Sequence, residues 1–382
     1  MSYTGLQREL SDNFRRMPGD GMIPGTRIKV VTETFRSRNG YNLPVRTPAN
    51  GIFSGFFSGE DLAETNNNFQ YRIFLPENPA KGYIILLHGL NERSWDKYLM
   101  WALRMASDTG KPVILFPIAY HMNRSPLSWF DRHAMMPAVA ARLISEPATR
   151  MASFVNVALS VRMSMTPQRF FLSGSQAVND IAFLLETIRS GHHPHISTDA
   201  APDIFAYSIG AMITQVLMLS KDELLPDESR IILFCGGSVL NMMDGTSKMI
   251  MDSRAFDRLI NFYIDEIDDR IKHGGDWFTR QLEQTSVGEA FYAMSSMKRL
   301  DEVYKDPFSK NSGRIKAISF KSDTVIPASA VSATMHGADV EIWTPEYPNS
   351  HENPFPILNG DLSVKVDNTF DRLFDTTALF FS

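Results

Sequence analysis

The sequence predicts an α/β protein built on a doubly wound, mostly parallel sheet, and three observations support this class. Short apolar runs rich in Val, Ile, Phe and Tyr alternate with helical stretches along most of the chain. The first two runs alternate polar and apolar residues and have no obvious helix between them, as antiparallel strands would, whereas the later runs are continuously apolar, as parallel strands buried on both faces are. The 382 residues, 43% of them hydrophobic, suit one large domain with insertions.

Eight segments are the expected strands, each an apolar or alternating run rich in strand-forming residues: 28–34, 69–75, 83–88, 113–118, 204–208, 230–236, 315–320 and 340–344. Helical patterns lie between the later strands and after the last one: "SWDKYLMWALRMASD", "QAVNDIAFLLETIRS", "GAMITQVLMLS", "PASAVSATMHG" and "SVKVDNTFDRLFDTTALFF". Strands and helices that alternate in this way favour parallel strands joined by helical crossovers.

Two segments depart from this alternation, and each follows the end of a strand. Residues 121–168 contain four prolines with helical patches between them, and residues 241–312 contain about three amphipathic patches. Because insertions after strand C-termini lie over the ligand-binding edge of an open α/β sheet, we predict that both form a cap or lid. An extra helical layer without a role in binding is the alternative. The main domain is expected over 28–382, and the extension 1–27 could form a short amphipathic helix that docks on the domain or on a partner.

Charge and composition argue against several classes of partner. The net charge is −5, the pI is about 6.0, and the basic residues are scattered, so we expect neither nucleic acid nor anionic lipid as a partner. The single cysteine, Cys235, excludes an intramolecular disulfide, and in an apolar strand it is expected to be inert. No run of about 18 apolar residues predicts a membrane span, and the N-terminus is too charged for a signal peptide, so a cytoplasmic location is expected.

The pentapeptide Ala206-Tyr207-Ser208-Ile209-Gly210 has the pattern of a nucleophile elbow. It follows an apolar strand and opens a helix, and the residues two before and two after the serine are small, as such a sharp turn requires. The turn would lift the Ser208 hydroxyl above the sheet, beside a helix N-terminus that favours an oxyanion. We therefore predict that Ser208 is a nucleophile.

An acid and a base follow later strands. Asp323 lies three residues after strand 315–320, and His351 lies in the loop that follows the last strand. Because parallel strands collect their carboxyl ends at one edge of the sheet, both residues are expected near Ser208. The order serine, acid, histidine along the chain supports a triad of Ser208, Asp323 and His351.

Other residues could fill these roles less well. Ser238 is followed by the bulky Leu240, and Ser175 has the pattern of a helix cap. His336 precedes the last strand and so falls on the opposite edge of the sheet, and Asp339 and Glu346 are the alternative acids. Asp323 could also be only a helix N-cap, and His351 only a solvated turn residue.

The oxyanion hole is expected from the sequence His88-Gly89-Leu90, which follows the strongest early strand. The backbone N–H groups of Leu90 and Ile209 are the predicted donors, and His88 is expected to brace the loop by hydrogen bonding. We expect no metal and no organic cofactor. The histidine cluster "GHHPH" (192, 193 and 195) lies between a helix and a strand start, on the wrong edge, and is interpreted as a polar loop.

In these motifs the chain resembles the α/β-hydrolase superfamily over about residues 28–382. The resemblance rests on "HGLN", the "AYSIGA" elbow, Asp323 and His351, each after its strand, and Ala206 stands where glycine is usual. It implies an eight-stranded sheet whose second strand is antiparallel, a Ser-Asp-His triad, and a cap commonly inserted after the sixth strand. The segment 241–312 occupies that position.

The predicted reaction is acyl transfer to water, with a small molecule as substrate. A carboxylic ester with an apolar acyl or alcohol part is the first choice, and Trp129, Phe130, Trp277 and Phe278 are candidates to line its pocket. An amide, a thioester or a carbon–carbon bond could be cleaved by the same triad. A binding protein that keeps the fold without the chemistry is the alternative from another class.

Overall fold

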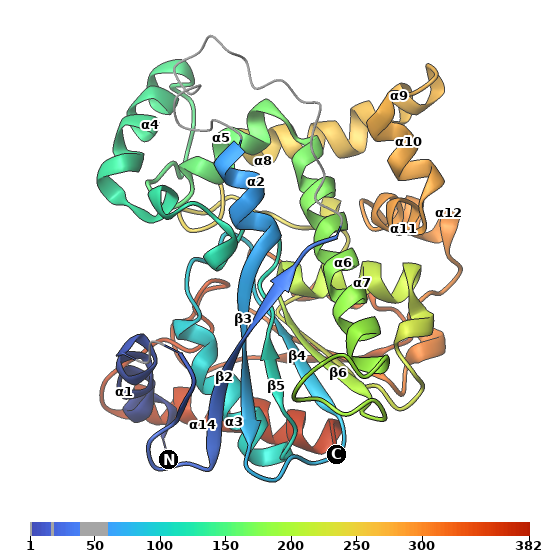
Figure 1. The fold of residues 1–382 in the computed structure, drawn as a ribbon. Helices are drawn as coiled ribbons and strands as arrows, with labels where there is room; N and C mark the ends of the chain where they lie inside the picture. The colour runs from blue at the N-terminus through green and yellow to red at the C-terminus, as the bar shows by residue number, and fades with distance from the viewer. Residues whose placement is uncertain (1, 17–18, 39–59) are drawn as a thin grey trace.

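The computed structural model describes residues 2–16, 19–38 and 60–382, and these residues build one nine-stranded sheet (Figure 1). The strand order is β1-β2-β3-β5-β4-β6-β7-β8-β9. The strands are β1 (Gly21–Met22), β2 (Ile28–Arg36), β3 (Asn68–Pro76), β4 (Tyr83–Leu87), β5 (Val113–Leu115), β6 (Pro202–Tyr207), β7 (Ile231–Phe234), β8 (Ile315–Phe320) and β9 (Asp339–Trp343). All eight predicted strands are confirmed, and the short β1 adds a ninth at the edge.

The direction of the strands agrees with the predicted class. β3, the second of the eight expected strands, runs antiparallel to both β2 and β5, and every pairing from β5 onward is parallel. The central strands β4, β6 and β7 are buried along their whole length, which explains their unbroken apolar sequences. The sheet is therefore the open, mostly parallel sheet of an α/β-hydrolase fold.

Helices cover both faces of this sheet. One face packs against α3 (Asp96–Thr109) and α14 (Asp361–Phe380), and the other against α6 (Gln168–Arg189), α7 (Ile209–Ser220) and α13 (Ala328–Thr334). Successive residues of β7 show the division, because Ile231 and Leu233 belong to the core under α6 and α7 while Ile232 and Phe234 belong to the core under α3 and α14.

The extension that precedes β2 packs on the domain. Helix α1 (Tyr3–Arg16) lies against α3 and α14 (Figure 1). The Tyr3 hydroxyl donates to the Phe355 carbonyl at 3.0 Å, and Arg15 pairs with Asp96 at 2.7 Å. Of the two outcomes expected for this segment, the structure shows docking on the domain itself.

The two insertions lie together beyond one end of the sheet, at the top of Figure 1. The first holds η2 (Met122–Arg124), η3 (Leu127–Phe130), α4 (Arg132–Ser145) and α5 (Val157–Met165). The second holds η5 (Leu240–Met242), α8 (Ser253–Ile260), the π-helical η6 (Asn261–Glu266), α9 (Ile267–Lys272), α10 (Trp277–Gln284), α11 (Ser286–Ala293), α12 (Met297–Val303) and η7 (Ser309–Asn311). A buried bidentate pair joins them, from Arg142 Nε and Nη2 to Asp252 at 2.9 and 3.0 Å.

Two details of the sequence interpretation are wrong. Helix α6 begins at Gln168, directly after Pro167, so Ser175 is a buried interior residue and not a cap. The small residues around it let α6 approach α11 closely, since a Cβ at Gly174 would lie 3.0 Å from the Phe291 ring. A helix, α2 (Glu60–Asn67), also stands directly before β3, although none was expected between the first two strands; residues 39–59 of that connection lie outside the described residues.

Candidate active site

Ser208 occupies a strained turn between β6 and α7. Its backbone has φ 57° and ψ −120°, a conformation that costs on the order of 1–3 kcal/mol for a residue other than glycine. The turn is possible because its neighbours are small. A Cβ at Gly210 would lie 2.9 Å from the Leu87 carbonyl oxygen, and one at Gly236 would lie 2.8 Å from the Ser208 carbonyl oxygen. Gly236 is a requirement that the elbow pattern alone did not reveal.

Ser208, His351 and Asp323 form one hydrogen-bonded chain. The Ser208 Oγ lies 2.7 Å from His351 Nε2, and His351 Nδ1 lies 2.8 Å from Asp323 Oδ2. The other carboxylate oxygen accepts the backbone N–H groups of Val325 and Ile326, both at 2.9 Å. With the carboxylate ionised, Nδ1 carries the ring proton and Nε2 is left to accept a proton from the serine. All three residues are 5–6% exposed.

Tyr207, the last residue of β6, holds His351 in place through two contacts. Its hydroxyl donates to the His351 carbonyl, and its ring stacks on the imidazole with 5.6 Å between centroids and 18° between planes. Both contacts fix the loop that carries His351, which otherwise has no regular secondary structure.

The loop after β4 is held by buried side chains. His88 donates from Nδ1 to the Gly89 carbonyl at 2.8 Å and accepts the Ile118 N–H on Nε2 at 2.9 Å. Burial lowers the pKa of His88 well below its ordinary value, which keeps the ring neutral and able to play both roles. The Gly89 N–H donates to the Tyr98 hydroxyl at 2.9 Å. The role of Tyr98 could not be predicted from the sequence, because the residue occupies an ordinary buried position of α3.

The loop after β4 packs against the first turn of α7. A Cβ at Gly210 would lie 3.0 Å from the His88 carbonyl oxygen, so the 88–90 loop packs against the first turn of α7. Within the described part of the chain, the N–H groups of Leu90 and Ile209 have no hydrogen-bond acceptor. That these two N–H groups hold an oxyanion stays a prediction of the sequence.

The two insertions cover this loop. The Asn91 side chain donates to the Val155 carbonyl at 3.0 Å and to the Met249 carbonyl at 2.6 Å, and so contacts both insertions. Ser153 also donates to the Lys248 carbonyl at 2.6 Å. Asn91 adopts φ 61°, a conformation that asparagine tolerates better than most residues. Its position directly after "HGL" is the only feature of the sequence that could have indicated this bridging role.

A small cavity of about 40 Å³ lies beside Leu90, between the loop after β4 and helices α5 and α6. Trp129 lines it, whereas the other three predicted pocket aromatics do not. Phe130 belongs to a small cluster within the first insertion. Trp277 and Phe278 pack on the main core, where the Phe278 ring lies 5.5 Å from that of Phe171. The two adjacent aromatic residues of the second insertion thus contribute to packing.

The alternative residues lie apart from this chain of hydrogen bonds. Ser238 is fully buried and donates to the Val239 carbonyl, and Glu346 pairs with Lys365 at 3.0 Å. Asp339 pairs with Lys316, and His336 is exposed after α13. Cys235 is buried, and burial raises the pKa of its thiol well above the ordinary value.

The three histidines of "GHHPH" contact three different partners. His193 Nε2 lies 3.0 Å from the Tyr71 hydroxyl, His195 Nε2 lies 2.8 Å from Glu33, and His192 Nδ1 lies 2.9 Å from the Ser190 hydroxyl. Across 2–16, 19–38 and 60–382, no three His, Cys, Asp or Glu side chains are grouped as a metal site would require.

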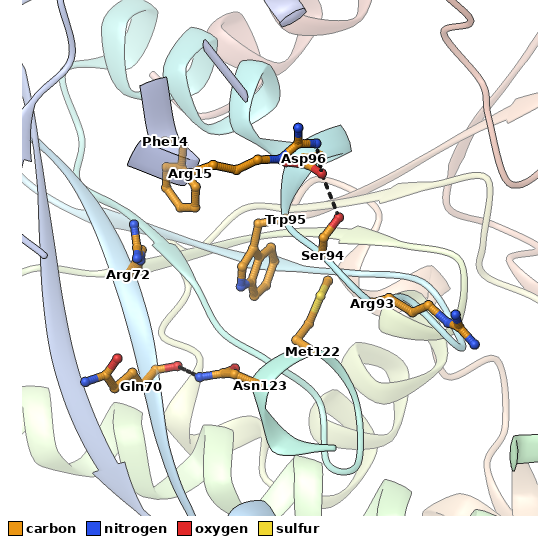
Figure 2. A pocket seen from close by; sticks show the side chains of 10 residues that line it. All are labelled: Phe14, Arg15, Gln70, Arg72, Arg93, Ser94, Trp95, Asp96, Met122 and Asn123. Atoms are coloured by element: carbon orange, nitrogen blue, oxygen red, sulfur yellow. Dashed lines mark hydrogen bonds and ion pairs between the residues drawn. The ribbon is translucent and has the colours of Figure 1, made fainter. Parts of the chain in front are cut away.

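A larger pocket of about 360 Å³ opens between α1, β3 and the start of α3 (Figure 2). Figure 2 shows Trp95 at its centre, with Phe14 and Arg72 on one side and Met122 on the other. The Arg72 guanidinium lies over the Phe14 ring at 4.2 Å from its centroid. None of the predicted site residues lines this pocket. Trp95, which does line it, packs against His88 with 5.4 Å between ring centroids, so the pocket adjoins the loop after β4.

The sheet order and the elbow place the chain in the class of α/β-hydrolase-fold proteins. More narrowly, the chain belongs to a family of unknown function (DUF6051), whose sequence model matches residues 56–382. No curated protein matches the sequence. No helix among the described residues is long and apolar enough to cross a membrane.

Solved structures with a similar arrangement include esterases and a serine hydrolase, all at low identity. Carboxyl esterase 2 of the fungus Tuber melanosporum is 11% identical, with 98% of this chain and 97% of that chain covered and a TM-score of 0.45. A hyperthermophilic esterase of Pyrobaculum calidifontis is 8% identical, with 99% and 89% covered and a TM-score of 0.46. A serine hydrolase of Cycloclasticus zankles is 13% identical, with 82% and 94% covered and a TM-score of 0.39.

Proposed function

We propose that this protein is a serine hydrolase that cleaves a carboxylic ester through an acyl-enzyme on Ser208. The observation that carries the proposal is the unbroken chain from Ser208 Oγ to His351 at 2.7 Å and from His351 to Asp323 at 2.8 Å. A serine hydroxyl is a weak nucleophile by itself, and a positioned base oriented by a carboxylate is what activates it.

The first half of the reaction acylates the serine. Ser208 Oγ attacks the ester carbonyl while its proton passes to His351 Nε2, and the negative charge of Asp323 stabilises the imidazolium that forms. The N–H groups of Leu90 and Ile209 receive the oxyanion, and each donor of this kind contributes about 10²- to 10³-fold in rate. His351 then gives the proton to the leaving alkoxide, and the alcohol departs.

The second half returns the enzyme. A water molecule takes the place of the alcohol, His351 removes its proton, and attack on the acyl carbonyl releases the carboxylic acid and the Ser208 hydroxyl. An ester is the proposed substrate because an alkoxide leaves more readily than an amine, so the one proton that His351 donates is enough to complete the step. The apolar part expected of the ester would lie against Leu90, Trp129 and Phe170, which line the cavity together with polar side chains.

The segments 121–168 and 241–312 act in this proposal as a cap. Ser208 is 5% exposed, and Asn91, in the loop after β4, is hydrogen-bonded to both segments. In this proposal a substrate therefore reaches the serine only when these segments move. An Asn91→Ala variant should raise amide hydrogen exchange in residues 149–157 and 243–253 while the exchange of β4 and β6 stays low. Unchanged exchange in both covering segments would count against a cap.

A fluorophosphonate probe tests the proposed nucleophile. The wild-type protein should be labelled and should hydrolyse 4-nitrophenyl acetate, and Ser208→Ala should abolish labelling and lower kcat at least about 10⁴-fold. Ser238→Ala is the matched control, since Ser238 is a buried serine in the loop after the neighbouring strand, and it should leave labelling intact. A wild-type protein that resists the probe, or a Ser208→Ala protein that is still labelled, would overturn the mechanism.

A further inference from the structure

Two arginine side chains line the cavity beside Leu90 without an acidic partner. Arg162, from α5, is 6% exposed, and Arg169, from the first turn of α6, is partly buried. Neither guanidinium makes a hydrogen bond or ion pair with any residue that the structure describes. The one carboxylate of the cavity wall, Glu92, is already engaged by Lys97 and by the Tyr98 hydroxyl.

Other buried arginines of the same chain show what is missing. Arg124 is fully buried and pairs with Asp180 at 2.7 Å, and Arg142, 4% exposed, pairs with Asp252 at 2.9 Å. Taking a cation out of water is costly unless an anion or well-placed acceptors compensate it. Arg162 is as buried as these residues and has no such anion.

The surroundings of Arg162 orient its guanidinium but leave its donors unused. The Tyr120 and Trp129 rings each lie 4.9 Å from its central carbon, so the group is held between two aromatic faces. Burial first, and then the neighbouring charge of Arg169, lower the pKa of Arg162 to about 9, so this guanidinium stays charged at neutral pH. Two repelling cations with free N–H groups therefore face the same small space.

From this geometry we propose that the substrate carries a carboxylate as well as its ester, and that Arg162 and Arg169 bind the carboxylate. The proposal rests on the function proposed above, because it places the carboxylate at the arginine end of the cavity and the ester carbonyl beyond Leu90, at Ser208, which does not itself line the cavity. A guanidinium presents a planar fork of donors that matches a carboxylate, and such charge-assisted bonds are about twice as strong as neutral ones. The cavity of about 40 Å³ admits such a substrate only when the covering segments move, as the proposed cap requires, and a short chain between the two groups, as in the half-ester of a short dicarboxylic acid, needs the least opening.

The test compares matched substrates that differ only in charge. Mono-4-nitrophenyl glutarate is set against the ester in which the free acid is a carboxamide, and 3-carboxyphenyl acetate against 3-carbamoylphenyl acetate, which places the charge on the leaving group. In at least one pair the wild-type kcat/KM should favour the acid about 10- to 100-fold, as expected for charged hydrogen bonds. Acid and amide cleaved equally well in both pairs would overturn the inference.

Variants show whether the arginines cause the preference. Arg169→Gln should lower the acid-to-amide ratio about 10-fold, and Arg169→Lys should restore part of it, because a lysine keeps the charge but not the fork. Arg162→Lys gives a second measurement at the more buried position. Arg280→Gln, at an exposed arginine on α10, removes the same charge elsewhere and should leave the ratio unchanged. A ratio that Arg169→Gln does not lower would overturn the inference.

A binding measurement separates this inference from the hydrolase proposal. Glutarate binding, measured by calorimetry on Ser208→Ala protein, needs no chemistry, and adding Arg169→Gln should weaken it about 10-fold. If glutarate binds in this way but Ser208 resists the fluorophosphonate, the carboxylate site stands and the hydrolase mechanism fails. If Ser208 is labelled but glutarate does not bind and the amide is cleaved as fast as the acid, only the carboxylate site fails.

Discussion

Replacing Asp323 by asparagine tests the proposed mechanism most sharply, because the structure dictates how the amide must sit. One carboxylate oxygen accepts the N–H groups of Val325 and Ile326, both at 2.9 Å. An amide nitrogen in that place would face two donors and lose both bonds, at about 1–3 kcal/mol for each group left unsatisfied. The amide oxygen therefore stays there, and the NH2 group points at His351 Nδ1.

The consequence is the wrong tautomer of His351. An NH2 group 2.8 Å from Nδ1 requires that atom to accept, so the ring proton moves to Nε2 and points at Ser208, which can no longer give up its own proton. The same change in a Ser-His-Asp triad costs about 10⁴-fold in kcat, which corresponds to about 5.4 kcal/mol of activation free energy.

The assay is kcat on 4-nitrophenyl acetate together with the rate of fluorophosphonate labelling, and both should fall together. The unfolding temperature should change little, since the variant keeps the two backbone hydrogen bonds. Glu346→Gln is the control, because this alternative acid is 77% exposed and pairs only with Lys365 at the surface. A decrease of less than 10-fold in Asp323→Asn, or an equal decrease in Glu346→Gln, would refute the assignment.

Two further predictions concern stability. Gly210→Ala should lower the free energy of unfolding by about 1–3 kcal/mol in a denaturant titration, since its Cβ would meet β4 backbone at 2.9 Å, whereas Gly313→Ala, in open space, should be neutral; equal midpoints would contradict this. Burial lowers the pKa of His121 to about 4, so between pH 6.5 and 4 the unfolded chain binds the proton more readily and stability falls with falling pH, by up to about 3 kcal/mol. His121→Asn should flatten that part of the pH profile of unfolding, and an unchanged slope would show that other groups cause it.

The sequence allowed the sheet to be predicted well because its signals are local. Unbroken apolar runs mark strands buried on both faces, and the order of those runs places Ser208, Asp323 and His351 at one edge. The meeting of these three side chains follows from the parallel sheet rather than from their own neighbours in sequence. Their roles in catalysis stay predictions for the experiments above.

The insertions were less predictable because their contacts are long-range. Arg142 and Asp252 are 110 residues apart, and nothing near either one indicates the partner. For the same reason the sequence could not separate Arg142, which has a carboxylate, from Arg162, which has none among the described residues. Trp129 and Phe278 likewise look alike in sequence, although one lines the cavity and the other fills the core.

The Arg142–Asp252 pair has a consequence for any attempt to redesign the cap. Deleting residues 241–312 to widen substrate choice would remove Asp252 and leave the Arg142 guanidinium with only the partly exposed Glu146, 3.4 Å from its Nη1, as counter-charge. Losing the buried partner costs up to about 3–5 kcal/mol, which has nothing to do with substrate. The two insertions are therefore one unit for engineering, to be exchanged together or with Arg142 replaced by an apolar residue of similar length. A truncated protein that loses activity would otherwise report on the broken buried ion pair rather than on its specificity.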